Sequence, residues 1–99
     1  MSDSFNKLVE VIRALRDPET GCPWDIKQTH KSIRKYFIEE TYEAVEAIDR
    51  EDDEEFCSEL GDVLLQVMLH AQIAADRKAF TIEDVVNGIT DKMLSLIHI

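Results

Sequence analysis

Apolar residues recur every three or four positions along four stretches of the chain, which is the spacing of one buried helix face. The first stretch, with Asp3 or Ser4 as its cap, ends at Asp17-Pro18. Its apolar residues are Phe5, Leu8, Val9, Ile12 and Leu15. The second is expected to begin after Thr29 as cap and to run to about Arg50. Among its residues we expect burial of Ile33, Phe37, Ala44, Val45 and Ile48.

The third helix, expected over about residues 54–77, is apolar on nearly every side from Leu60 onward. A helix of this kind is buried on all sides, so we expect it in a central position or at a subunit interface. The acidic run that precedes it, residues 51–55, is read as a solvated turn that caps the helix. Thr81 with Asp84 resembles a capping box and opens the fourth helix. Its apolar stripe consists of Ile82, Val85, Val86, Ile89, Met93 and Leu96.

No strand-like alternation is present in the sequence, so the predicted fold class is all-α. Short connections favour antiparallel neighbours, and we expect a four-helix antiparallel bundle. Pro18, Gly21 and Pro23 interrupt the pattern between the first two helices. The resulting loop of about a dozen residues is long for a small domain, which makes it a candidate functional loop.

Composition narrows the function classes. The 99 residues are expected to form a single domain, residues 1–99, with a modest core that dimerisation would enlarge. The net charge of −10 argues against a nucleic-acid partner and against an anionic membrane surface. The charged residues near the N-terminus are unlike the apolar core of a signal peptide, so we expect none, and the longest uncharged run, residues 63–75, is too short to span a bilayer. We therefore expect a soluble cytoplasmic protein in which Cys22 and Cys57 are reduced thiols.

Two acidic clusters are the strongest chemical signal. Glu40 and Glu43 lie one turn apart on the second helix, and Glu59 and Asp62 lie one turn apart on the third. Two opposed faces of this kind would form a four-carboxylate cage, in which like charges ~4 Å apart repel by roughly 4 kcal/mol at an effective dielectric of ~20. A divalent cation would relieve this repulsion, and all-oxygen ligands favour Mg²⁺, or alternatively Mn²⁺, over zinc. The competing interpretation is a pair of solvated polar helix faces.

With the surrounding segments, these clusters resemble the MazG branch of the all-α nucleoside triphosphate pyrophosphohydrolases. The resemblance covers about residues 8–92 and rests on these segments: Gly21-Cys22-Pro23-Trp24-Asp25, Gln28-Thr29-His30, Glu39-Glu40-Thr41-Tyr42-Glu43, Glu59-Leu60-Gly61-Asp62-Val63-Leu64-Leu65-Gln66-Val67 and His70-Ala71. It implies Mg²⁺-dependent hydrolysis of a nucleoside triphosphate to the monophosphate and pyrophosphate, usually in a homodimer. It also implies that the metal ligands are Glu40, Glu43, Glu59 and Asp62.

The resemblance, for Glu39 and Lys92, and the sequence pattern, for the others, assign less definite roles to further residues. Glu39 is a candidate for an outer-shell ligand or for orienting the attacking water. Lys92 and Lys31 are candidate phosphate contacts, although surface solubility is the plainer reading of Lys31. Trp24 can stack on a base or, as is commoner for a lone Trp, hold the long loop against the bundle. Gln66 and His70 are read as a satisfied buried polar pair.

Alternatives remain open for the extent of the chain and for its function. Residues 93–99 depart from the family pattern, which continues with an arginine and a His-Pro-His segment, so the chain is interpreted either as a candidate N-terminal fragment of a longer protein or as a chain with an aberrant end. The alternative function is a non-catalytic helical interaction or metal-sensing domain that retains the cage. A di-iron bundle is set aside because the sequence has no Glu-x-x-His pair.

Overall fold

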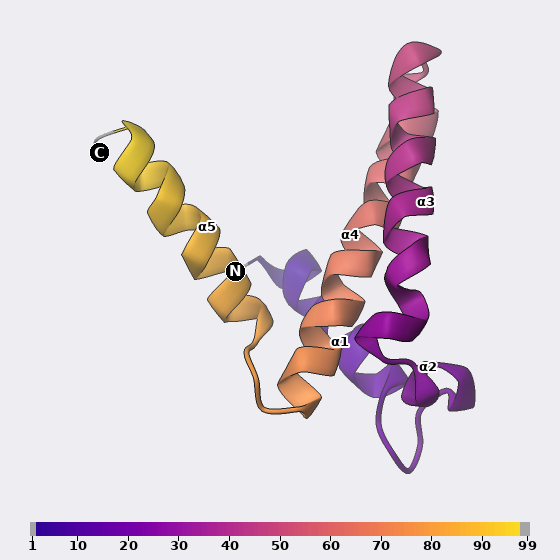
Figure 1. Cartoon of the computed structure of the whole chain (residues 1–99), viewed down its shortest axis with the longest axis vertical. Helices are drawn as coiled ribbons and strands as arrows, with labels where there is room; N and C mark the ends of the chain where they lie inside the picture. Colours follow the sequence, from indigo (N-terminus) through magenta and orange to yellow (C-terminus); the bar gives the residue numbers. More distant parts are fainter. Residues whose placement is uncertain (1, 98–99) are drawn as a thin grey trace.

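The computed structural model describes residues 2–97, and within them the chain is all-helical (Figure 1). The helices are α1 (Asp3–Leu15), α2 (Pro23–Lys27), α3 (His30–Asp49), α4 (Asp53–Asp76) and α5 (Ile82–Ile97). The four predicted helices are confirmed. The short α2, which lies inside the predicted loop, was missed because five residues make less than two turns and show no periodicity. Pro23 at its first position, where the fixed φ of proline suits a helix, was the available signal.

Side-chain caps mark the N-terminal ends of the helices. Thr29 and Ser32 form a reciprocal capping box at the start of α3, and Asp52 accepts a hydrogen bond from the Glu55 backbone N–H, 3.0 Å away, at the start of α4. The predicted box at α5 is also confirmed, because the Thr81 backbone N–H donates to Asp84 Oδ2 at 2.9 Å. The predicted cap of α1 was wrong. Ser2, rather than Asp3 or Ser4, accepts from the Phe5 backbone N–H.

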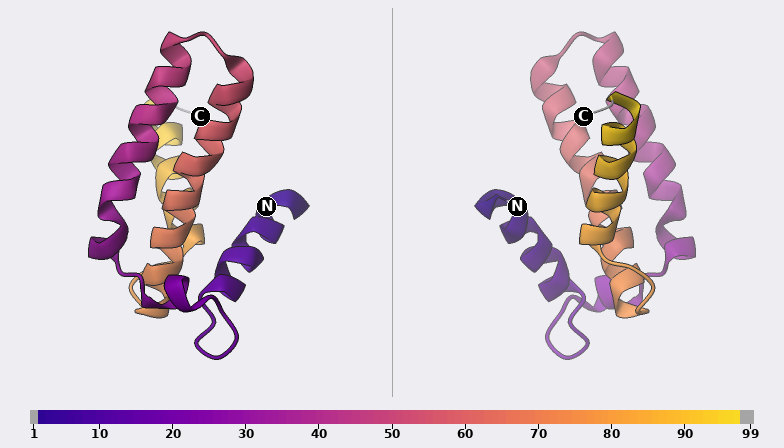
Figure 2. Two further views of the ribbon diagram at one scale, coloured as in Figure 1. Left: turned by 90° about the vertical axis from the view of Figure 1, so that its right-hand side faces the viewer. Right: turned by 90° about the vertical axis from the view of Figure 1, so that its left-hand side faces the viewer.

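Helices α3 and α4 form a long antiparallel hairpin, and α4 is the central element because α1 and α5 also pack on it (Figures 1 and 2). Both outer helices contact α4 over only a short part of its length, near the end of the hairpin where α2 lies, and then lean away. The arrangement is thus an open version of the predicted bundle.

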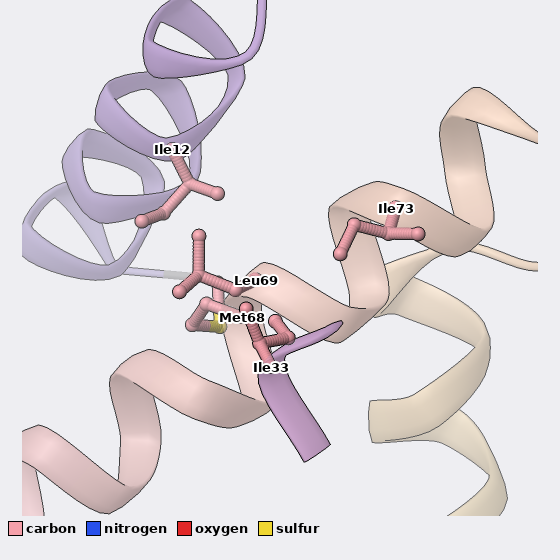
Figure 3. Packing of buried hydrophobic residues seen from close by; sticks show 5 residues of the cluster. All are labelled: Ile12, Ile33, Met68, Leu69 and Ile73. Atoms are coloured by element: carbon pink, nitrogen blue, oxygen red, sulfur yellow. The ribbon is translucent and has the colours of Figure 1, made fainter. Parts of the chain in front are cut away.

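The hydrophobic core lies at that same end of the hairpin. Figure 3 shows its five buried side chains, which come from α1, α3 and α4: Ile12, Ile33, Met68, Leu69 and Ile73. Each is at most 8% exposed. The other end of the hairpin has no such cover, and the predicted burial of Val45 and Ile48 is wrong, since they are 46% and 52% exposed. Likewise α4 is not buried on all sides, because Leu64 is 41% exposed.

The segment between α1 and α3 is held by the side chain of Arg16. The Arg16 guanidinium donates to Asp76 Oδ2 at 2.9 Å, to the Gln28 carbonyl oxygen at 3.1 Å, and to the Asp25 carbonyl oxygen. A Cβ at Gly21 would collide with the carbonyl oxygen of Leu15, so only glycine fits this turn. The loop that carries α2 is therefore fixed against the ends of α1 and α4.

Two further expectations concern the whole chain. Cys22 and Cys57 are free, as predicted. Among the helices of residues 2–97, none combines the length and the apolar character needed to cross a membrane. The last two residues of the atypical tail, His98 and Ile99, lie outside the described residues.

Candidate metal centre

Four carboxylates converge where α3 faces α4. Glu40 and Glu43 come from α3, and Glu59 and Asp62 come from α4. In each helix the two acids are three positions apart and share a face, and the antiparallel hairpin turns the two faces toward each other. One oxygen from each of the four residues lies within 4.8 Å of the other three. The predicted four-carboxylate cluster is therefore formed in space.

The electrostatics of this cluster are unfavourable without a cation. Glu40 Oε2 and Glu59 Oε2 are buried and have no hydrogen-bond partner. Burial, followed by the negative charges of Glu43 and Asp62, raises the pKa of Glu40 above its ordinary 4.5. Burial, followed by the hydrogen bond and charge of Glu43, also raises the pKa of Glu59. Within residues 2–97, the ion pairs of Lys and Arg involve none of the four acids.

These observations fit a hard divalent cation. The donors are all carboxylate oxygens, which is the ligand type that Mg²⁺ and Mn²⁺ prefer. Two of the oxygens are buried without a partner and gain one when a cation binds. The donor set therefore suits the ion that the sequence predicts.

Three other predicted site residues lie outside the carboxylate cluster. Glu39 adjoins Glu40 in α3, but its side chain is exposed and lies outside the four-oxygen group. Lys31, also exposed, is nine positions before Glu40, which is about 14 Å along the helix axis. Lys92 is exposed on α5, which leans away from the hairpin (Figure 1). The structure thus brings neither lysine to the carboxylates.

Trp24, in contrast, lies in a pocket that reaches the cluster. The pocket has a volume of about 380 Å³ and its lining includes Trp24, Tyr36, Glu40 and Gln66. Trp24 is 51% exposed, and its ring centroid lies 6.4 Å from that of Tyr36. The Gln28 side-chain amide donates to the Trp24 carbonyl oxygen at 2.7 Å. The missed helix α2 is therefore the element that positions Trp24.

Sequence reasoning did not propose Tyr36 or Gln66 as residues of the site. Tyr36 lies four positions before Glu40, and Gln66 lies four positions after Asp62, so each continues the face that bears a cluster acid. This i,i+4 relation was the available signal. For Gln66, the same relation alone favours a structural role.

The predicted satisfied pair of Gln66 and His70 is wrong. His70 Nδ1 instead lies 2.8 Å from His30 Nδ1, and the two rings stack with an interplanar angle of 5°. Gln66 Oε1 and His70 Nε2 are both buried and have no partner. The pairing differs because of a contact between helices: His30, at the start of α3, contacts His70 on α4 and takes the place predicted for Gln66.

The half-buried His70 predicts a pH effect on stability. Burial, followed by the charge of His30, lowers the pKa of His70 below its ordinary 6.5. The unfolded chain therefore takes up the proton first, and stability is lost as the pH falls from 6.5 toward the lowered value. For one proton the slope is at most about 1.4 kcal/mol per pH unit. Urea unfolding of wild type and His70→Leu at pH 7.5, 6.5 and 5.5 should show the smaller acid loss in the variant.

The comparison isolates His70 because both proteins retain Glu40 and Glu59. The raised pKa of each of these carboxyls works in the opposite sense, stabilising the fold as the pH falls toward 4.5. Parallel pH dependences in the two proteins would show that His70 does not control acid stability.

Comparisons with known proteins identify the family of the chain. The model of the MazG nucleotide pyrophosphohydrolase domain matches residues 28–95, which include all four cluster acids. The chain is 56% identical, over 91% of its length, to the nucleoside triphosphate pyrophosphohydrolase/pyrophosphatase MazG of Thermotoga maritima. It is 44% identical, over 92% of its length, to the nucleoside triphosphate pyrophosphohydrolase of Escherichia coli. It is also 58% identical, over 91% of its length, to the uncharacterized protein YabN of Bacillus subtilis.

These relatives are longer proteins. The chain spans 35% of the length of the Thermotoga and Escherichia relatives and 18% of that of YabN. The family match itself covers more than half of the chain and contains the converging carboxylates of α3 and α4. The chain belongs to the MazG nucleotide pyrophosphohydrolase domain family.

Proposed function

We propose that this domain hydrolyses nucleoside triphosphates to the monophosphate and pyrophosphate with the help of Mg²⁺. The observation that carries the proposal is the convergence of four carboxylates, two of them with a buried oxygen that lacks a partner. The family match and the names of the Thermotoga and Escherichia relatives support the reaction class. Mn²⁺ is the alternative ion, because it has the same preference for oxygen ligands.

Glu40, Glu43, Glu59 and Asp62 would hold the cation in this reaction. When bound, a divalent cation neutralises charge on the phosphate oxygens and acidifies the attacking water. Water attacks the α phosphorus, the bond from that phosphorus to the oxygen that bridges it to the β phosphorus breaks, and pyrophosphate leaves with the bridging oxygen. Glu39, exposed beside Glu40, is proposed to orient the water and to receive its proton. Positioning and charge stabilisation supply most of the acceleration in such reactions.

Substrate contacts complete the proposal. Trp24 would border the nucleoside, because it shares a pocket with Glu40. Lys31 and Lys92 are proposed to meet the phosphates, which requires that their long side chains, or α5 itself, approach the hairpin when the substrate binds.

We also propose a homodimer. Large apolar side chains stay uncovered on α3 and α5, among them Tyr42 at 67% exposed, Leu96 at 69% and Ile89 at 52%. The α3 residues border an apolar hollow of about 330 Å³ lined by Phe37, Ile38, Thr41, Tyr42 and Val45. Extended apolar surfaces mark interaction sites. Sedimentation equilibrium measures the mass, and a monomer at micromolar concentration would contradict the dimer.

The reaction is tested by incubating the purified chain with a panel of nucleoside triphosphates and Mg²⁺. We expect pyrophosphate and the monophosphate in equal amounts, and no product when the metal is chelated. Orthophosphate as the first product would indicate a phosphatase instead. Mg²⁺ binding without turnover of any nucleotide would favour the alternative function, a non-catalytic interaction or metal-sensing domain.

A further inference from the structure

We infer that Gln66 reads the nucleobase, with its side-chain amide hydrogen-bonding to the polar edge of a base held in the pocket between α2, α3 and α4. The inference rests on the proposed function and adds a specificity-determining residue to it. Three independent features of the pocket support it: the state of the amide, the distance to the carboxylates, and the aromatic wall.

The first feature is the Gln66 amide itself. Gln66 is 7% exposed, and it is the buried polar residue of the core-facing side of α4. Its Oε1 is buried without a hydrogen-bond partner, so the folded chain carries a desolvated acceptor. Such a group costs free energy unless something donates to it. A ligand with an N–H group that enters the pocket would supply the missing donor.

The second feature is the position of Gln66 relative to the carboxylates. It lies four residues after Asp62 in α4, which is about 6 Å along the helix axis. Glu40, another of the cluster acids, lines the same pocket as Gln66. A nucleotide whose phosphates lie at the carboxylates therefore has its nucleoside end beside this amide.

The third feature is the chemistry of the pocket walls. Trp24 and Tyr36 contribute aromatic rings whose planes are 54° apart, and Leu65 and Leu69 contribute apolar surface. The volume of about 380 Å³ is within the range of small-molecule pockets. A nucleobase combines a π face for the aromatic wall with N–H donors and ring acceptors at its edge. An amide offers both an acceptor and donors, so it can pair with such an edge.

A purely structural role for Gln66 makes the opposite stability prediction. If the amide held the helices together, its replacement by methionine, which has similar length and no amide, would lower the melting temperature. If the amide is kept for a ligand, Gln66→Met removes an unsatisfied acceptor and the melting temperature of the ligand-free chain stays equal or rises.

The experiment uses Trp24, the single tryptophan of the chain, as a fluorescent reporter inside the pocket. Wild type, Gln66→Met and Gln72→Met are titrated with AMP, GMP, CMP and UMP in the presence of Mg²⁺. Gln72 is the matched control, because it lies on the same helix, bonds to Asp76 Oδ1 at 2.9 Å and is absent from this pocket.

We expect nucleotides to change Trp24 fluorescence and the wild-type dissociation constants to differ among the four bases. In Gln66→Met the spread between the best and the worst base should shrink by about tenfold, whereas Gln72→Met should retain the wild-type order. The inference is overturned by equal weakening for all bases, by no base preference in the wild type, or by a lower melting temperature of Gln66→Met.

The result also separates this inference from the proposed reaction. Pyrophosphate release without any Trp24 response would place the base elsewhere and leave the reaction standing. A base-selective Trp24 response that depends on Gln66, without hydrolysis, would support the inference and count against the proposed function.

Discussion

Glu43→Gln and Glu59→Gln should each abolish metal-dependent pyrophosphate release, with a loss in kcat/KM of at least about a hundredfold, because the metal contributes several kcal/mol to such reactions. Glutamine has nearly the shape of glutamate but lacks the negative charge that a hard cation requires. The two residues come from different helices, yet each offers an oxygen to the same four-oxygen group. Initial rates at increasing Mg²⁺, together with circular dichroism, would show lost activity with unchanged helical content.

Glu54→Gln is the matched control for these variants. Glu54 is exposed in the first turn of α4, close in sequence to Glu59 and outside the carboxylate group. Its substitution removes the same charge and should leave the rate within about twofold, since an exposed surface change has an effect of about 0.5 kcal/mol or less. Comparable losses in all three variants would mean that net charge, and not the cluster, controls the activity.

The convergence of the carboxylates could be predicted largely from the sequence. Helical periodicity fixes that Glu40 and Glu43 share one face and that Glu59 and Asp62 share another. The short acidic turn between the helices makes them an antiparallel pair. The register of that pair decides whether the two faces meet. It is set by the packing between the two helices, in which Ile33 takes part, and is visible only in the structure.

Contacts between distant residues were the main source of error. His70 was paired with Gln66, its neighbour on the same helix face, whereas its partner in the fold is His30, forty positions away. Local spacing shows which side chains share a face, but it does not show what the next helix presents to them. The pocket could not be predicted either, because Trp24 belongs to a helix that is too short to show periodicity in the sequence.

Exposed apolar residues explain the remaining errors. Val45 and Ile48 follow the stripe of α3 correctly, but the single chain offers no helix to cover them. A hydrophobic pattern records which residues favour burial, and the cover can come from another element or from another copy of the chain. In the dimer that we propose, a second copy of the chain would cover these exposed residues.

Mg²⁺ should stabilise the fold by about 2.7 kcal/mol when its concentration is a hundred times its dissociation constant. For a domain of this size, this corresponds to a rise in melting temperature of roughly 10–20 °C. The expected cause is the ligand-free cluster, in which Glu40 and Glu59 have raised pKa values and each holds a buried oxygen without a partner. Thermal melts at pH 7.5 with and without Mg²⁺ measure the shift.

General screening must be separated from binding in this experiment, because the net charge of −10 makes any added salt stabilising to some degree. NaCl at matched ionic strength provides that baseline. Glu59→Gln provides the second control: it relieves repulsion in the ligand-free cluster, so its melting temperature without metal should equal or exceed that of wild type, while its response to Mg²⁺ should fall to the NaCl baseline. Equal melting temperatures of the wild type in Mg²⁺ and in matched NaCl would count against a metal site. If the four converging carboxylates bind a cation in the folded chain, that binding must stabilise the fold.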